Sequence, residues 1–165
     1  MAELSPAEKL QPSLLDRLRD DEPEKKQESR TNRVISSKKL RDFAIRDLSW
    51  LLNTTKFGVH HDLSQMPDVA NSTLNYGVGS MSGASINRDN VRPIEQEVKR
   101  AILNFEPRID AKSLSVNVFF DTEEMGRNAM VFEIQGELWG NPIPTSLFLK
   151  TEIDLETGGV NVMPA

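Results

Sequence analysis

Apolar residues recur every three to four positions in two stretches of the chain, which is the spacing of a helix with one buried face. The stripe of the first stretch consists of Leu40, Ala44, Leu48 and Leu51. Ser36 stands where an N-cap is needed, so we expect a helix from about Ser37 to Leu52. Phe43 and Trp50 lie beside the stripe and are expected to widen its buried face.

The second helical stretch begins near Asn90. Its apolar stripe consists of Val91, Ile94, Val98, Ala101, Ile102 and Phe105. Pro107 ends this helix, because its ring blocks the next turn and the residue before a proline is pushed out of the helical region. Glu106 and Arg108 therefore flank a rigid corner of the chain. A carboxylate and a guanidinium at such a corner either brace the domain internally or contact a partner, and the pattern leaves both open.

Beyond the corner, apolar and polar residues alternate, as they do in strands with one buried face. Three such runs and a shorter fourth cover about Leu114–Phe120, Met130–Leu138, Leu147–Leu155 and Val160–Val162. Short connections predict antiparallel neighbours, and one apolar face per strand predicts helices on that face. The expected fold is α+β, with a small antiparallel sheet of three to four strands, helices packed on one of its faces, and an N-terminal helical extension.

The N-terminal region departs from this pattern. Ser13 has the position of an N-cap, with Asp16 three residues later. Two helical turns there carry three leucines on one face, Leu14, Leu15 and Leu18. So short a helix needs a surface to dock on, which either its own domain or a partner protein provides. The stretch Asp20–Arg30 has no apolar residue and predicts a solvated linker. We therefore divide the chain into residues 1–33, a docking helix with a charged linker, and residues 34–165, a single domain.

Composition narrows the classes of partner and compartment. The 165 residues include no cysteine, which excludes disulfides, thiolate metal sites and cysteine nucleophiles. The net charge of −5 argues against a nucleic acid or an anionic membrane as a nonspecific partner. The first residues lack the features of a signal peptide. No apolar run approaches the roughly 18 to 20 residues of a membrane helix. We expect a cytoplasmic protein without membrane insertion.

Three motifs are candidates for chemistry. His60-His61-Asp62 offers ligand atoms, but adjacent histidines point apart and no third ligand follows at a recognisable spacing, so we expect no metal and no cofactor. The glycine-rich Asn75–Gly83 lacks the Lys-Ser/Thr pair of a phosphate loop. Glu133 and Glu137 share a strand face and would supply the carboxylate pair of a glycoside hydrolase. A solvated outer sheet face accounts for them more simply.

Four segments in order resemble one known family. They are Ser13–Leu18, the helix end Leu51–Thr54, the corner Phe105–Arg108 and the turn Asp154–Gly159. Together they resemble the TssE baseplate wedge subunits of bacterial type VI secretion systems. These are relatives of the small wedge proteins of contractile phage tails that are often labelled lysozyme-related. The resemblance extends from about Ser13 to Val162.

This resemblance implies a structural subunit of a cytoplasmic baseplate rather than an enzyme. Such a subunit links the other wedge subunits, of the TssF, TssG and TssK type, and offers a sheet edge on which contractile sheath subunits assemble. The resemblance also implies baseplate contacts for Glu106, Pro107 and Arg108. A second docking element would be formed by Leu14, Leu15 and Leu18. Two alternatives remain at this point: a peptidoglycan-cleaving glycoside hydrolase, which takes the lysozyme label literally, and an unrelated cytoplasmic adaptor.

Overall fold

The computed structural model describes residues 13–18, 23–24, 36–80, 91–120, 129–139, 145–154 and 157–164. The helical elements are α1 (Leu14–Leu18), α2 (Ser37–Leu52), η3 (Phe57–Val59), α3 (Pro67–Ala70), η4 (Thr73–Asn75) and α4 (Val91–Phe105). The strands are β1 (Ser115–Phe120), β2 (Ala129–Leu138), β3 (Thr145–Asp154) and β4 (Val160–Pro164). Most of the predicted linker and the end of the glycine-rich stretch lie outside the described residues. In the part of the chain that is described, no helix is long and apolar enough to cross a membrane.

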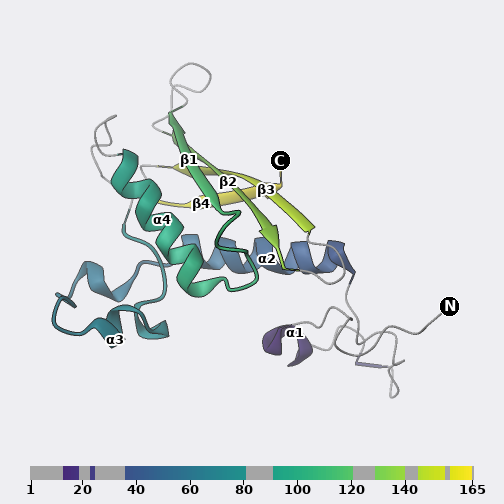
Figure 1. Cartoon of the computed structure of the whole chain (residues 1–165), viewed down its shortest axis with the longest axis horizontal. Coiled ribbons are helices and arrows are strands. Elements are labelled where there is room, and N and C mark those ends of the chain that lie inside the picture. Colours follow the sequence, from purple (N-terminus) through teal and green to yellow (C-terminus); the bar gives the residue numbers. More distant parts are fainter. Residues whose placement is uncertain are drawn as a thin grey trace.

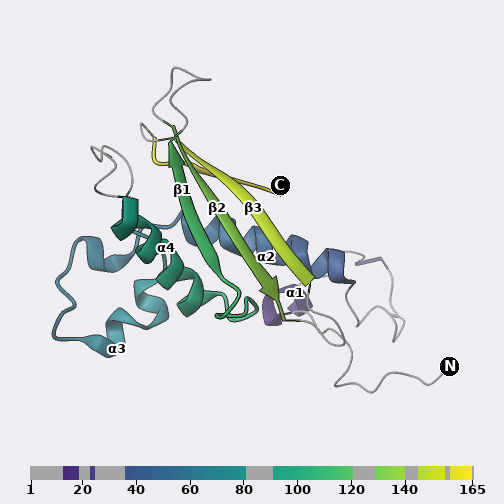
Figure 2. The ribbon, with the colours of Figure 1, turned by 45° about the horizontal axis from the view of Figure 1, so that its top comes forward.

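The strands form one antiparallel sheet in the order β1-β2-β3-β4. Figures 1 and 2 show α2 and α4 against one face of this sheet, while α3 lies apart from it. One row of paired residues that faces the helices consists of Val118, Phe132, Thr151 and Val162. Thr151, the polar member of that row, is fully buried and donates its hydroxyl to the carbonyl of Phe132 at 3.2 Å. The predicted α+β fold is confirmed.

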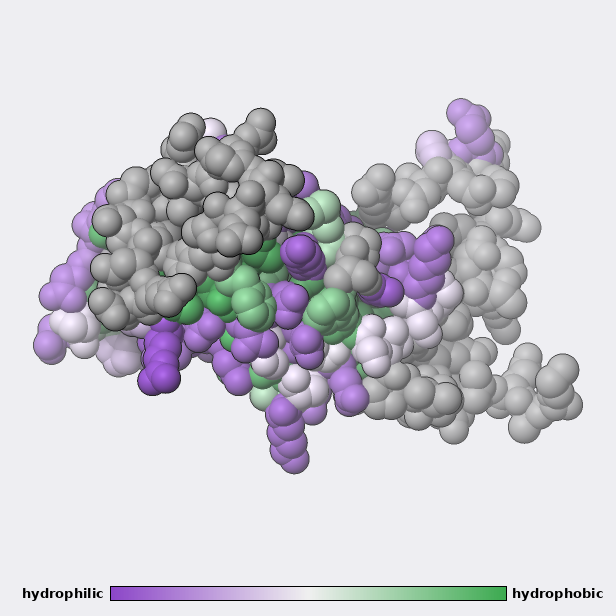
Figure 3. Space-filling view, turned by 90° about the horizontal axis from the view of Figure 1, so that it is seen from above, coloured by the Kyte–Doolittle hydropathy of each residue, from purple (hydrophilic) through white to green (hydrophobic). Residues whose placement is uncertain are grey.

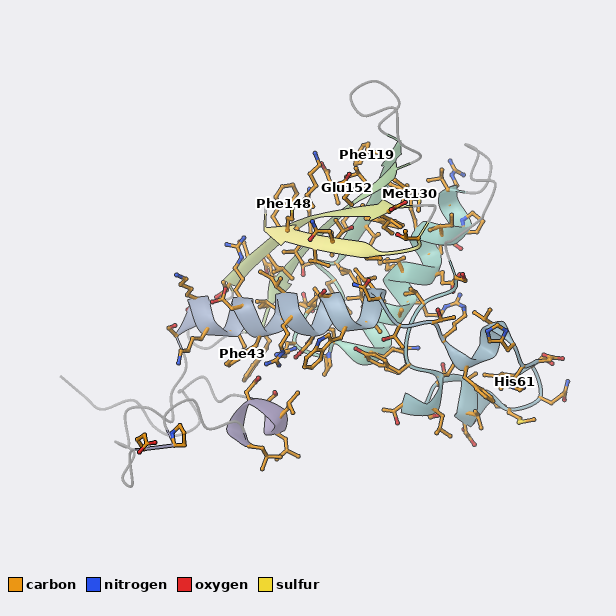
Figure 4. All side chains as sticks on the ribbon, turned by 180° about the vertical axis from the view of Figure 1, so that it is seen from behind. Phe43, His61, Phe119, Met130, Phe148 and Glu152 are labelled. Atoms are coloured by element: carbon orange, nitrogen blue, oxygen red, sulfur yellow. The ribbon has the colours of Figure 1, made fainter. Side chains whose placement is uncertain are left out.

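The outer face of the sheet is mixed in character. Phe119, Phe148 and Glu152 lie on the side that faces away from α2 (Figure 4). Phe119, Phe148 and Met163 are exposed there, and small hydrophobic areas alternate with hydrophilic ones in the view from above (Figure 3). The described helices therefore cover one face of the sheet, as the alternating pattern predicts.

Helix α2 has the predicted bounds, and its ends are capped by side chains. Ser36 Oγ accepts a hydrogen bond from the Lys39 amide at 3.2 Å. At the other end, Asn53 Nδ2 donates to the Ser49 carbonyl at 2.8 Å. The Ser36 cap satisfies an amide that has no partner within the helix. The Asn53 side chain adds a second bond to a carbonyl that already accepts from the Asn53 amide at 3.1 Å.

One expectation for α2 is wrong. Phe43 packs against the core, but Trp50 is half-exposed. The reason is that Trp50 lies on the flank of the helix occupied by Arg46, whose guanidinium carbon is 4.9 Å from the centroid of the indole ring. A cation above the ring replaces the hydrophobic neighbours that burial would require.

The two edge strands, β1 and β4, differ in which side chains pair with their outer backbone groups. On β1, the outward amide of Val118 donates to Glu95 Oε1 of α4 at 2.9 Å. On β4, the Asn53 side chain pairs with the backbone of Val160, donating to its carbonyl at 2.8 Å and accepting from its amide at 3.0 Å. Because backbone groups alternate sides along a strand, Val162 directs its N–H and C=O to the same outer edge. No described residue pairs with them.

Strand β4 also leaves part of β3 uncovered. It pairs with Leu149–Ile153, so the stretch Thr145–Phe148 has no described strand on that side. The β4 side of the sheet therefore has backbone groups available for pairing, whereas Glu95 occupies a donor on the β1 side.

The segment between α2 and α4 folds around one asparagine. Asn75 Oδ1 accepts from the Gly58 amide and Asn75 Nδ2 donates to the Ala70 carbonyl, both at 2.8 Å. Gly77 follows with φ +119°, and a Cβ at this position would collide with the carbonyl oxygen of Thr54. The glycine is therefore needed for close backbone approach rather than for phosphate binding.

Candidate functional site

At the corner after α4, the carboxylate of Glu106 points into the protein. The helical hydrogen bonding continues one residue past α4, since the Glu106 amide donates to the Ile102 carbonyl at 2.8 Å. The Ile109 amide then donates to the Glu106 carbonyl at 3.2 Å and closes the turn around Pro107. Pro107 is exposed, whereas Glu106 is only 3% exposed. A buried carboxylate has to be paired.

Arg108 provides that pairing through its guanidinium. Its Nε donates to Glu106 Oε1 at 2.6 Å, and its Nη2 donates to Glu106 Oε2. The same Nη2 also donates to Asp47 Oδ2 on α2 at 2.5 Å. Burial alone would lower the pKa of Arg108, but the two carboxylates outweigh it and raise the pKa above its ordinary value. The fork geometry is one that arginine forms and lysine does not.

The ion pairing continues from the corner to the N-terminal helix. Asp47 Oδ1 accepts from Arg46 Nε at 2.8 Å, and Arg46 Nη1 donates to Asp16 Oδ1 at 2.6 Å. The side chain of Asp16 is wholly buried. We call Glu106, Arg108, Asp47, Arg46 and Asp16 the corner network. Its charges alternate in sign and connect the end of α4 through α2 to α1.

Tyr76 packs over the same corner. Its ring meets the Phe105 ring edge-on at a centroid distance of 5.2 Å, and its hydroxyl donates to the Asp47 carbonyl at 3.4 Å. Burial raises the pKa of the Tyr76 phenol, and the nearby negative charges of Asp47 and Glu106 raise it further. Tyr76 thus covers the network with an aromatic ring that stays neutral.

Helix α1 is attached through its polar side. Both views of the ribbon place it beside α2 (Figures 1 and 2). Ser13 Oγ donates to Asp16 Oδ2 at 2.6 Å, so the predicted cap residue orients the acid that holds Arg46. The three leucines Leu14, Leu15 and Leu18 are 71%, 52% and 75% exposed. Their side chains are therefore presented to solvent rather than packed on the described part of their own domain.

The geometry of the corner supports one of the two open alternatives and leaves the other untested. Glu106 and the guanidinium of Arg108 form an internal brace. The partner contact predicted for Glu106, Pro107 and Arg108 stays a prediction, as does the contact predicted for the leucines of α1. Of the Arg108 side chain, a fifth is exposed. The sequence pattern singled out neither Asp47 nor Arg46. Asp47 is 61 residues from Arg108 along the chain, so no local pattern connects the two.

The other candidate chemistry finds little support in the geometry. Among the described residues no three His, Asp or Glu side chains group as metal ligands, and the His61 ring stacks on Phe57 instead. Glu133 and Glu137 lie on the outer side of β2. A cavity of about 400 Å³ lies between α4 and the α2–α4 connection, and neither of these glutamates lines it.

The corner network braces the domain internally, and α1 presents three leucines to solvent. Comparison with known proteins supplies the family. The family described as "Baseplate wedge protein gp25" matches residues 39–143, so the chain belongs to the gp25 baseplate wedge family. Its role is accordingly that of a structural component of a phage-tail-type baseplate.

Comparison with individual proteins adds little to the family assignment. A crystal structure of a putative tail lysozyme from Geobacter sulfurreducens is similar at 22% identity and a TM-score of 0.46. That similarity covers 71% of this chain and 92% of the other. No curated protein sequence matches the chain.

Acid is expected to release α1 from α2. Burial would raise the pKa of Asp16, but the hydrogen bond from Ser13 and the charge of Arg46 outweigh it and hold the pKa below its ordinary value of 3.8. Because the pKa of Asp16 is lowered when α1 is docked, its carboxylate stabilises docking above pH 3.8. This stabilisation is lost as the pH falls through the pKa of the docked state. We expect a contribution of about 1 kcal/mol.

Fluorescence of Trp50 reports this release, since Arg46 links the indole to Asp16. In a Trp139→Phe chain, the Trp50 emission is expected to change with a midpoint below pH 3.8. Asp16→Asn in the same background removes the titrating group and should abolish that transition. An unchanged transition in the Asn variant would show that another group controls it.

Proposed function

We propose that this chain is a TssE-type wedge subunit of a type VI secretion baseplate. In this role it links neighbouring wedge subunits and provides a platform for assembly of the contractile sheath. Membership of the gp25 baseplate wedge family supports a baseplate role. The observation that carries the linking role is α1, whose acid is tied to α2 while its leucines remain exposed.

The leucines of α1 are suited to a protein partner. Burying one leucine side chain stabilises an association by about 1.5–3 kcal/mol, and a five-residue helix gains little from its own hydrogen bonds. The Asp16–Arg46 bond holds the helix in one place, so less conformational entropy is lost on binding. We assign this surface to another wedge subunit, of the TssF, TssG or TssK type.

The sheet edge supports the sheath platform. A partner strand that joins a sheet needs unpaired N–H and C=O groups along an edge. On the β4 side, no described strand pairs with the outer groups of Val162 or with Thr145–Phe148. We propose that an extended segment of a sheath subunit pairs on this side.

The remaining parts of the proposal concern the corner and the compartment. Pro107 and the exposed edge of Arg108 would contact a wedge subunit while Glu106 holds the guanidinium from inside. The baseplate would lie on the cytoplasmic side of the membrane, and no nucleic acid is involved. The net charge of −5 agrees with a protein partner rather than a polyanion.

Deletion of the gene in the source bacterium tests this function. We expect sheath tubes, imaged with a fluorescent sheath subunit, to disappear and to return when the wild-type chain is supplied. Sheath tubes of normal number and length in the deletion strain would contradict the proposal and favour an adaptor outside this machine.

The hydrolase alternative is tested on the purified chain. Release of soluble fragments from peptidoglycan that disappears with Glu133→Gln would overturn the structural assignment. The proposal predicts no release by either protein.

A further inference from the structure

Trp139, directly after β2, is 68% exposed. The exposed indole nevertheless stands on a fixed backbone. The Trp139 amide donates to the carbonyl of Arg108 at 2.7 Å, and the Asp110 amide donates to the carbonyl of Glu137 at 2.9 Å. The chain leaving the corner therefore pairs with the end of β2, and Trp139 lies opposite Arg108.

The residues between these two hydrogen bonds anchor the pairing in the core. Ile109 and Leu138 form an antiparallel bridge, and both are buried. A shift of Trp139 would have to displace one of these two side chains from a packed interior. The backbone of Trp139 is thus held in place on one side of the corner, and its indole is left uncovered.

Two carboxylates lie two residue pairs along from Trp139, both on the same side of it. Asp110 and Glu137 lie opposite each other across the bridge, and both are exposed. No described cation pairs with either of them. Like charges directly opposite each other on neighbouring strands destabilise a fold, so this arrangement does not serve the stability of the domain.

The chain's other tryptophan provides a comparison. Trp50 is also partly exposed, but the guanidinium of Arg46 lies over its ring. Within the described residues no cation or aromatic ring stacks on Trp139 in the same way. Trp139 is the tryptophan whose ring faces remain available to a partner.

We infer that Trp139 is the anchor of a protein interface. Its indole enters an apolar pocket of a neighbouring baseplate subunit, and lysine or arginine side chains on the rim of that pocket face Asp110 and Glu137. Tryptophan is enriched among residues that dominate interface energies, and complementary rim charges speed association. A cation on the rim also gains from the face of the indole. The inference rests on the proposed function, because it names the chemistry of a wedge partner beside the corner.

The test measures binding of the full chain to the wedge complex of the same bacterium, purified from a strain that lacks this chain. We expect Trp139→Ala to raise the dissociation constant about 30-fold, the usual loss for an anchor residue. The matched control is Phe119→Ala, because Phe119 is an aromatic residue that is 50% exposed and pairs with Val131, eight residues before Trp139 on β2. This control is expected to change the dissociation constant less than about threefold.

A second variant tests the charges without touching the indole. Asp110→Lys combined with Glu137→Lys places positive charge against the expected basic rim. We expect association to slow about tenfold or more at low salt, and the difference from wild type to shrink as salt rises. If Trp139→Ala does not fold, this lysine variant tests the inferred interface by itself.

The outcomes separate the inference from the proposed function. If the wild-type chain does not bind the wedge complex, the proposed function fails. If it binds, but Trp139→Ala behaves like Phe119→Ala and the lysine variant associates at the wild-type rate, the inference alone is overturned. Weaker binding by the folded Trp139→Ala chain, together with slower association of the lysine variant, supports it.

Discussion

Replacing Arg108 by alanine is expected to lower the free energy of unfolding by about 3–5 kcal/mol, the cost of leaving a buried charge unpaired. Glu106 is 3% exposed, and its carboxylate loses both bonds from the guanidinium in this variant. Asp47 loses one bond as well. Urea unfolding followed by circular dichroism measures the loss.

Companion variants identify the cause. Arg108→Lys keeps the charge but cannot form the fork, so we expect an intermediate loss of about 1–2 kcal/mol. Adding Glu106→Gln to Arg108→Ala removes the unpaired charge and should restore part of the stability. The matched control is Arg100→Ala, since Arg100 is exposed on α4 and pairs with no described residue. Its effect should stay within about 0.5 kcal/mol.

The same series tests the brace against the contact surface. A loss below about 1 kcal/mol for Arg108→Ala would mean that the network contributes little to stability, as many exposed pairs do. If the remaining folded protein binds the wedge complex normally, Arg108 acts only as a brace. Weaker binding by folded Arg108→Ala, beyond its loss of stability, would add a direct contact.

The second large effect is expected on binding. Changing Leu14, Leu15 and Leu18 together to serine should weaken binding to the wedge complex at least about 100-fold, because burial of each leucine contributes about 1.5–3 kcal/mol. The free energy of unfolding should change by less than about 0.5 kcal/mol, since the three side chains are already exposed. Isothermal calorimetry and urea unfolding measure the two quantities on the same preparations.

Controls separate the apolar contact from the position of the helix. Leu74→Ser alters a leucine of similar exposure elsewhere and should bind like wild type. Asp16→Asn keeps the leucines but removes the negative charge that pairs with Arg46, so its loss of affinity should be smaller than that of the triple variant. Wild-type affinity in the triple variant would exclude α1 as a docking element. A large loss of stability would mean that the leucines pack on their own domain in solution.

The helices and strands could be predicted because their signals are local. The leucines of α2 recur with the helical period, and its caps at Ser36 and Asn53 follow within the same segment. Pro107 ends α4 through its own ring, whatever surrounds it. The alternation in β2 and β3 fixed which side chains face the core, and both strands have the expected inner face.

The candidate site could be predicted only in part. The sequence placed Glu106 and Arg108 on either side of a corner, and Asp16 in a cap position, but it did not connect them. The connection runs through Asp47 and Arg46. In the sequence, two charged residues at these positions are equally consistent with a solvent-exposed face of the helix. Trp50 was misassigned for a related reason, since its neighbour on the helix is Arg46 rather than the sheet.

By itself, the sequence determined the α+β class of this protein, the extent of α2, the end of α4 and the apolar character of α1. These properties depend on residues within one or two turns of each other, where backbone geometry relates spacing directly to direction. The tertiary structure alone decided that Glu106 is buried, that Asp16 is joined to the corner and that Trp139 is presented beside it. Each of these requires segments far apart in sequence to meet, and the pairing of charges depends on that meeting rather than on any local period.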